Sequence, residues 1–150
     1  MTTYRPIAET DIEILVKMMQ DFYAIDNYPI DPEKSKKLFS EFIANENLGK
    51  AWIIESDSKT VGYMILTFVF NFEYGGKIGF VDELYIVEAF RGKGIGAESI
   101  DFITKIASEE KLKLLYLEVE PHNKNARKLY LDKGFIGHKR QLLRRKLNNE

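Results

Sequence analysis

One stretch in the middle of the chain limits the possible folds more than any other. Residues 83–100 read ELYIVEAFRGKGIGAESI, an apolar strand-like run followed by a glycine-rich turn and then by a helical pattern. A second buried, strand-like run follows that helix over residues 114–119. A strand, a helix and a second strand in this order form a right-handed crossover, in which the two strands pair in parallel. The stretch therefore predicts an α/β fold with at least one parallel strand pair.

The segments before this crossover predict two helices and an antiparallel sheet. Apolar residues recur at three- and four-residue spacing over residues 10–24, and Thr10 with Glu13 has the spacing of a capping box. Asp31 followed by Pro32 predicts the start of a second helix. From residue 51 onward, runs rich in β-branched and aromatic residues alternate with turn sequences, as in successive hairpins.

The segments after the crossover complete the predicted domain. A last helix is expected to end at Gly134, and residues 135–147, FIGHKRQLLRRKL, are expected to add one or two strands whose basic residues face solvent. The prediction is a single domain over residues 1–150 of mixed α/β class. Its central twisted sheet is mixed, mostly antiparallel, has six to seven strands and is flanked by about four helices.

Composition excludes several classes of function. The formal net charge is -1, with 22 Lys and Arg against 23 Asp and Glu, so no global field draws the protein to nucleic acid or to an anionic membrane. The absence of cysteine excludes disulfides, thiolate catalysis and Cys-based metal sites. The two histidines have no third spaced ligand, so no metal is expected. Without a signal-peptide pattern or a membrane-length apolar run, the expected location is cytoplasmic.

The glycine-rich turn, RGKGIG, has three competing interpretations. A Walker phosphate loop is excluded, because Lys93 is followed by Gly94 and not by Ser or Thr. A dinucleotide fingerprint matches on its spacing, with Gly92, Gly94 and Ala97 in place and Glu118 at the end of the next strand. Against it, about 90 residues of helices and hairpins precede the motif, which does not suit a doubly wound sheet. The third interpretation is a turn without a ligand.

The chemistry of the turn favours a phosphate ligand. Backbone N–H groups at a helix start have no intrahelical partner and lie at the positive end of the helix dipole. Arg91 and Lys93 add positive charge locally. A cofactor that carries a diphosphate is the expected guest.

These motifs resemble those of the GNAT superfamily of acetyl-CoA-dependent N-acetyltransferases. The family's pyrophosphate loop, Gln/Arg-x-x-Gly-x-Gly/Ala, is matched by Arg91, Gly94 and Gly96. The later segment LEVEPHNKNARKLYLDKGF is similar to a second family signature. Its matching residues are Asn123, Ala126, Leu129, Tyr130, Gly134 and Phe135. The resemblance implies the GNAT fold, acetyl-CoA as co-substrate, no metal and an amine acceptor.

The resemblance also implies which residues bind the co-substrate. The backbone of three strand residues would pair with the pantetheine arm, and the glycine turn would hold the pyrophosphate. Two residues from later in the chain would contact the pantetheine arm and the sulfur of coenzyme A. The implied set is Leu84, Tyr85, Ile86, Arg91, Gly92, Lys93, Gly94, Ile95, Gly96, Ala97, Asn123 and Tyr130.

Three residues are candidates for catalysis. Tyr130 matches the family position whose hydroxyl reaches the sulfur of coenzyme A, where it would stabilise the departing thiolate. Asp82 and Glu83 match the strand on which a carboxylate often serves as the base. Because strand side chains alternate, one of the two should face the acceptor and the other away, unless a bulge disturbs the alternation.

The function implied is transfer of the acetyl group of acetyl-CoA to a primary amine of a small molecule or a protein, by direct attack in a ternary complex. The alternative is a catalytically silent acyl-CoA-binding or regulatory module of the same fold. A dinucleotide-binding oxidoreductase is the third hypothesis. The expected partners are acetyl-CoA and the amine, with neither nucleic acid nor membrane, and a homodimer is left open.

Overall fold

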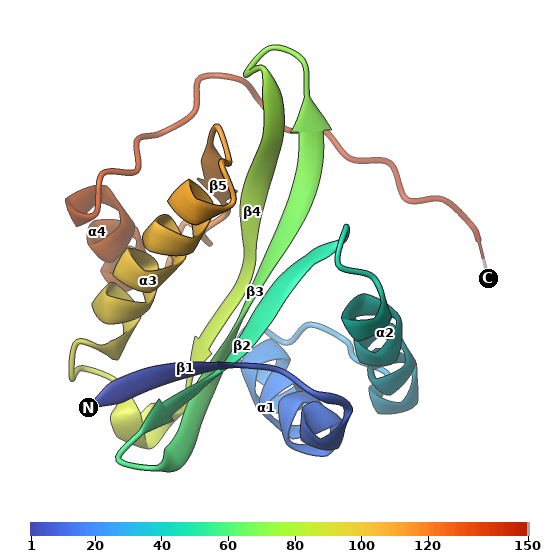
Figure 1. The fold of residues 1–150 in the computed structure, drawn as a ribbon, viewed down its shortest axis with the longest axis vertical. Coiled ribbons are helices and arrows are strands. Elements are labelled where there is room, and N and C mark those ends of the chain that lie inside the picture. Colours follow the sequence, from blue (N-terminus) through green and yellow to red (C-terminus); the bar gives the residue numbers. More distant parts are fainter. Residues whose placement is uncertain (150) are drawn as a thin grey trace.

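A computed structural model describes residues 1–149 as one five-stranded sheet with helices on both faces (Figure 1). The strands are β1 (Thr2–Pro6), β2 (Gly49–Ser56), β3 (Lys59–Asn71), β4 (Gly76–Ile86) and β5 (Leu115–Leu117). The helices are α1 (Ile12–Ile25), α2 (Pro32–Ala44), α3 (Ile95–Glu109) and α4 (Lys124–Asp132), with short 3₁₀ turns η1 (Glu9–Asp11) and η2 (Glu88–Phe90). The mixed α/β class and the four predicted helices are confirmed.

The strands lie in the order β1-β2-β3-β4-β5. All neighbours are antiparallel except β4 and β5, which are parallel as the crossover predicts. Helices α1 and α2 cover one face and α3 and α4 the other (Figure 1). The alternation of β2 divides the core between the faces, since Ile53 packs with the α1 cluster and Trp52 and Ile54 pack with the α3 cluster.

The predicted terminal strands are absent, so the described sheet has five strands and not six or seven. Residues 135–149 contain no strand, although α4 ends before Gly134 as expected. The physical reason lies in the pattern of the segment. Leu142 and Leu143 are adjacent and would point to opposite faces of a strand, so the segment has no single apolar face to bury on the sheet.

The start of α1 also differs from the prediction. The carboxylate that accepts from the backbone before the helix is that of Asp11, whose Oδ2 accepts from the Ala8 N–H at 2.8 Å. The predicted capping box of Thr10 with Glu13 is not formed. Both oxygens of Asp11 also accept from the Arg5 guanidinium, at 2.9 and 3.1 Å. The predicted cap of α2 is confirmed, because Asp31 accepts from the N–H groups of Glu33 and Lys34.

Loss of this buried carboxylate should destabilise the domain. We expect Asp11→Ala to lower the free energy of unfolding by about 1–2 kcal/mol, because it removes charge-assisted hydrogen bonds that join β1 to α1. Arg5 holds the pKa of Asp11 below its ordinary value, so this stabilisation is present above pH 4 and lost as the pH falls. Urea unfolding at about pH 7 and pH 3 measures both. Asp21→Ala, which removes an exposed pair with Lys17, is the control and should change little.

Candidate functional site

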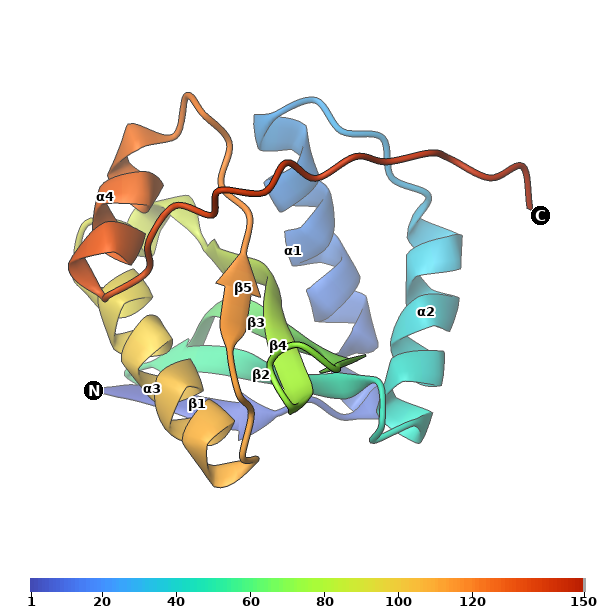
Figure 2. The ribbon, with the colours of Figure 1, turned by 90° about the horizontal axis from the view of Figure 1, so that it is seen from above.

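A cleft opens where β4 and β5 separate. The two strands pair only from Gly79 to Val81 on β4, against Leu115 to Leu117 on β5. Beyond Val81, β4 continues to Ile86 with β3 along one edge and, within residues 1–149, no strand along the other. Figure 2 shows β5 ending as β4 runs on toward η2. The cleft has a volume of about 1470 Å³, and residues 82–86 of β4 line it.

Nearly all of the predicted site residues line this one cleft. The residues that it brings together are Asp82, Glu83, Leu84, Tyr85, Ile86, Arg91, Gly92, Gly94, Ile95, Gly96, Ala97, Asn123 and Tyr130. Lys93 does not line the cleft, and its Nζ lies 4.8 Å from the centre of the Phe90 ring. These residues belong to two segments of the chain, 82–97 and 123–130. The crossover from β4 through α3 to β5 brings the two segments together in the fold.

The glycine turn presents open backbone to the cleft. Gly92 and Gly94 have positive φ angles of 75° and 84°, a region that side-chain-bearing residues rarely adopt. Gly94 is the N-cap of α3. A Cβ atom added at either glycine would meet no atom of the chain within 4 Å, so crowding inside the protein does not explain them. The space in front of this helix start is therefore free for an anionic ligand.

A bulge in β4 places both candidate carboxylates in the cleft. Ile65 pairs with Glu83 and the next residue, Leu66, pairs with Val81, so Asp82 is the extra residue of the bulge. The bulge breaks the alternation of side chains at this point. Asp82 and Glu83 consequently line the same cleft instead of facing opposite sides of the sheet.

Glu83 is held by two tyrosines from different elements. The hydroxyl of Tyr23, on α1, donates to Glu83 Oε2 at 2.5 Å, and the hydroxyl of Tyr63, on β3, donates to Oε1 at 2.6 Å. Loss of hydration raises the pKa of Glu83 above its ordinary value, although both tyrosines oppose that change. Burial, with the negative charge of Glu118, also raises the pKa of Asp82. Both groups are thus better proton acceptors than free carboxylates.

The two predicted residues of the α4 region have different surroundings. Tyr130 is half-buried and packs edge-on to Phe135 at 6.1 Å between ring centres. Burial raises the pKa of its hydroxyl, so Tyr130 keeps its proton and is a hydrogen-bond donor. Asn123 is the N-cap of α4, since its Oδ1 accepts from the Ala126 N–H at 3.1 Å. The start of α4, residues 123–126, lines the cleft.

Several residues of the cleft were not found from the sequence. Tyr23 lies one turn after buried Met19 on the inner face of α1, and this spacing was the only signal for it. Two contacts join the residues that follow α1 to the loop before α4. His122 Nε2 lies 2.8 Å from Asp26 Oδ1, and the Tyr28 hydroxyl donates to Glu120. These pairs are more than 90 residues apart in sequence, so no local pattern predicts them.

A smaller, mostly apolar pocket of about 220 Å³ adjoins the same carboxylates from the α1–α2 side. Tyr23, Asp82 and Glu83 line both spaces, so the carboxylates lie between them. Carboxylate side chains in the large cleft outnumber basic ones. A positively charged group in either space would be attracted to Asp82 and Glu83.

Other chemistries find less support in the described chain. Within residues 1–149, no three His, Asp or Glu side chains lie together in a way that could hold a metal ion. No helix of that part of the chain has the length and apolar character to cross a membrane. The sheet has one parallel pair at its edge, whereas a doubly wound dinucleotide-binding domain needs a mainly parallel sheet.

Comparison with known proteins assigns the class. The family model of the acetyltransferase (GNAT) family matches residues 16–135, so the chain belongs to the GNAT family. An uncharacterised N-acetyltransferase of Archaeoglobus fulgidus is 25% identical over 122 residues, which cover 80% of this chain and 83% of that protein.

Solved structures agree with the fold. An integron cassette protein from the mobile metagenome of Cole Harbour Salt Marsh is similar with a TM-score of 0.87 and 28% identity, over 98% of this chain and 91% of that one. The crystal structure of a predicted acetyltransferase with acetyl-CoA from Clostridium acetobutylicum is similar with a TM-score of 0.81 and 21% identity, over 97% and 96% of the two chains. The predicted GNAT fold is thereby confirmed.

Proposed function

We propose that this chain is an N-acetyltransferase that moves the acetyl group of acetyl-CoA to a primary amine. The observation that carries the proposal is the convergence at one cleft of a free strand edge, a glycine turn at a helix start, two carboxylates and a half-buried tyrosine. Acetyl transfer requires binding of the co-substrate, removal of a proton from the amine and stabilisation of the departing thiolate, and these parts of the cleft would provide them. Family membership supports the class of reaction, and the geometry supports the assignment of roles.

The co-substrate would lie along the cleft from α3 to β4. The open N–H groups at Gly92–Ala97 would bind the pyrophosphate at the positive end of α3. Arg91 borders the cleft, with its Nε donating to the Ile86 carbonyl at 2.8 Å and its guanidinium over the Tyr85 ring. The pantetheine amides would pair with the free edge of β4 at Leu84–Ile86, as an added strand does.

The amine requires removal of a proton before it attacks. An amine with a pKa of about 10.4 is only about 0.04% neutral at pH 7, which adds about 4.6 kcal/mol to the barrier. Glu83 is the base in this proposal, because Tyr23 and Tyr63 fix its carboxylate and burial raises its pKa. Asp82, beside it on the bulge, would attract the ammonium form of the acceptor.

The chemical step follows from these positions. The amine nitrogen bonds to the acetyl carbon, the carbon–sulfur bond breaks, and the amine proton passes to Glu83 directly or through water. The thiolate of coenzyme A accepts a hydrogen bond from the Tyr130 hydroxyl as it leaves, and it takes up, directly or through water, the second N–H proton that the nitrogen loses as the amide forms. Full proton transfer from tyrosine is uphill by about 2 kcal/mol on ordinary pKa values, and burial of Tyr130 adds to this.

The Tyr130 assignment predicts a selective kinetic defect. Tyr130→Phe should lower kcat by about tenfold or more and leave coenzyme A affinity nearly unchanged, because the lost hydrogen bond forms only as the thiolate develops. Steady-state kinetics with calorimetric binding separate the two quantities. Tyr116→Phe, which changes a tyrosine outside the cleft, is the control. An unchanged kcat for Tyr130→Phe would remove Tyr130 from the mechanism.

A single assay separates the proposal from its alternative. Purified protein is incubated with acetyl-CoA and a panel of polyamines, aminoglycosides, amino acids and peptides, with thiol release and the intact mass of the product as readouts. Acetylated amine supports the transferase. Measurable coenzyme A binding without turnover on any amine would favour a silent acyl-CoA-binding module.

A further inference from the structure

The smaller pocket beside the cleft combines an apolar wall with an acidic end. We call it the apolar pocket; residues of α1, α2, β3 and β4 form it, and its volume is about 220 Å³. Its wall is continuous with the core of the domain, because several of the side chains that line it are themselves buried. The apolar residues of this wall are Met19, Leu38, Phe39, Phe42 and Ile65.

The charged groups of the pocket are confined to one place. Within residues 1–149, the charged side chains that line it are those of Asp82 and Glu83, and its other polar side chains are neutral hydroxyls. The same two carboxylates line the large cleft, so the acidic end is where the pocket and the cleft meet.

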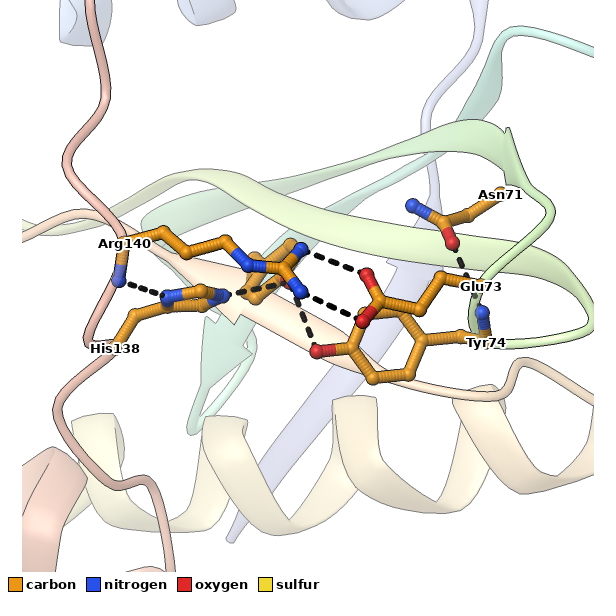
Figure 3. Close-up of polar contacts among 6 residues, drawn as sticks. Asn71, Glu73, Tyr74, His138 and Arg140 are labelled. Carbon is orange, nitrogen blue, oxygen red and sulfur yellow. Dashed lines mark hydrogen bonds and ion pairs between the residues drawn. The ribbon is translucent and has the colours of Figure 1, made fainter.

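The chain itself supplies no counter-charge to these carboxylates. At the surface beyond the turn between β3 and β4, Figure 3 shows a carboxylate that has one, since Arg140 donates to both oxygens of Glu73 at 2.7 Å. In contrast, no ion pair formed by residues 1–149 includes Asp82 or Glu83. Glu83 accepts from two tyrosine hydroxyls, which are neutral. A cationic group of a ligand would therefore be attracted to this end.

The apolar wall favours a hydrocarbon group at the other end of the ligand. Leu38 lines the pocket and is 53% exposed, so water still covers part of the wall. A hydrocarbon group in the pocket would remove this surface from water, which is favourable in proportion to the apolar area buried. A second charged group would lose its hydration there without gaining a partner.

The volume of the pocket limits the size of that hydrocarbon group. An apolar cavity of about 150 Å³ can hold one benzene molecule. At about 220 Å³, the apolar pocket has room for a phenyl ring with a short linker or for an unbranched chain of about six carbons. Several linked sugar rings would exceed this space.

From these features we infer that the apolar pocket takes an apolar monoamine as the acceptor, a primary amine on an alkyl or phenylalkyl body without a second charged group. The ammonium group lies at Asp82 and Glu83, and the hydrocarbon body fills the pocket. The nitrogen is then at the boundary with the cleft in which acetyl-CoA is proposed to bind. The role of this ligand as an acceptor rests on the proposed function, whereas its binding depends on the pocket alone.

Steady-state kinetics with matched amines test the substrate class. From propylamine to hexylamine, kcat/KM should rise about fourfold for each added CH₂ group, because each one leaves water for the apolar wall. 1,5-Diaminopentane has as many non-hydrogen atoms as hexylamine but ends in a second ammonium group. Its kcat/KM should be at least about tenfold lower. Equal or greater activity on 1,5-diaminopentane would overturn the inference and leave the transferase proposal intact.

A charge placed on the wall should reverse this preference. Leu38→Glu removes apolar area that hexylamine buries and adds a carboxylate that attracts the second ammonium group of 1,5-diaminopentane. The ratio of kcat/KM for hexylamine to that for 1,5-diaminopentane should therefore fall at least about tenfold. Leu131→Glu is the matched control, since Leu131 on α4 is 45% exposed and lines neither space. An unchanged ratio in a folded Leu38→Glu protein would contradict the inference.

A binding measurement separates the pocket from the reaction. Coenzyme A without an acetyl group cannot react, so calorimetry of hexylamine with the full chain saturated in coenzyme A reports binding alone. Hexylamine should bind, and Leu38→Glu should raise its Kd at least about fivefold with coenzyme A affinity unchanged. Such binding without acetylation of any amine would support the pocket and overturn the proposed function. No binding of hexylamine at millimolar concentration would overturn the inference.

Discussion

Replacing Glu83 by glutamine is expected to lower kcat/KM by about 10²- to 10⁴-fold, the range over which a positioned general base accelerates proton transfer. Glutamine keeps the shape of the side chain and can still pair with Tyr23 and Tyr63, so the fold and coenzyme A binding should survive. The variant keeps every contact that positions the amine but has no group that takes its proton. Steady-state kinetics with the best acceptor of the amine panel measure the loss.

The same substitution should act on stability in the opposite direction. Folding raises the pKa of Glu83 above the ordinary value of 4.5, so the folded state favours the protonated carboxyl. The stability that this proton contributes is complete below pH 4.5 and is lost as the pH rises through the raised pKa. At pH values above the raised pKa, the half-buried carboxylate of Glu83 therefore costs stability, and Glu83→Gln should melt there at an equal or higher temperature than the native protein.

Two further variants separate the possible outcomes. Glu109→Gln changes an exposed glutamate on α3, outside the cleft, and should leave both activity and melting temperature unchanged. Asp82→Asn removes the neighbouring carboxylate of the bulge and should raise KM more than it lowers kcat. An unaffected kcat/KM in Glu83→Gln, with a large loss of kcat in Asp82→Asn instead, would transfer the role of the base to Asp82.

The second large effect concerns the glycine turn. Gly94→Val should weaken coenzyme A binding at least about a hundredfold, since hydrogen bonds to charged groups contribute about 1.5–3 kcal/mol each and the variant disturbs several donors at once. A β-branched residue is strained at a φ of 84°, and its side chain would project into the open space in front of α3. Isothermal calorimetry with coenzyme A measures the change.

The turn between β3 and β4 provides a control for backbone strain alone. Gly75 has a φ of 83°, and an added Cβ there also meets no atom within 4 Å, but Gly75 lies outside the cleft. Gly75→Val should therefore show a similar loss of thermal stability with unchanged coenzyme A affinity. Native affinity in a folded Gly94→Val protein would show that the turn does not bind the pyrophosphate.

Local patterns predicted the parts of the site that depend on backbone conformation. Gly92 and Gly94 indicated a turn with a backbone conformation that other residues rarely adopt. The helix after them indicated unpaired N–H donors. Both features depend only on the nearest few residues. Asp31 with Pro32 predicted the start of α2 for the same reason. The crossover from β4 through α3 to β5 followed from element order and handedness.

Contacts between distant segments were beyond such reasoning. The bulge at Asp82 arises from the pairing of β4 with β3, and it reverses the expectation that Asp82 and Glu83 face opposite sides. Tyr23 and Tyr63 reach Glu83 from 60 and 20 residues away. Residues 135–147 were expected to join the sheet, because the leucines of this segment resemble those of a strand when the neighbouring edge is unknown.

The sequence by itself determined the class of fold and the glycine turn, and it named the groups proposed to bind a diphosphate, because these depend on element order and on local backbone preference. Only the tertiary structure decided that both carboxylates face one cleft, that two tyrosines hold Glu83, and that residues 136–149 stay exposed. Those features depend on strand register and on packing between segments far apart in the chain, and such contacts leave no periodic trace in the order of the residues.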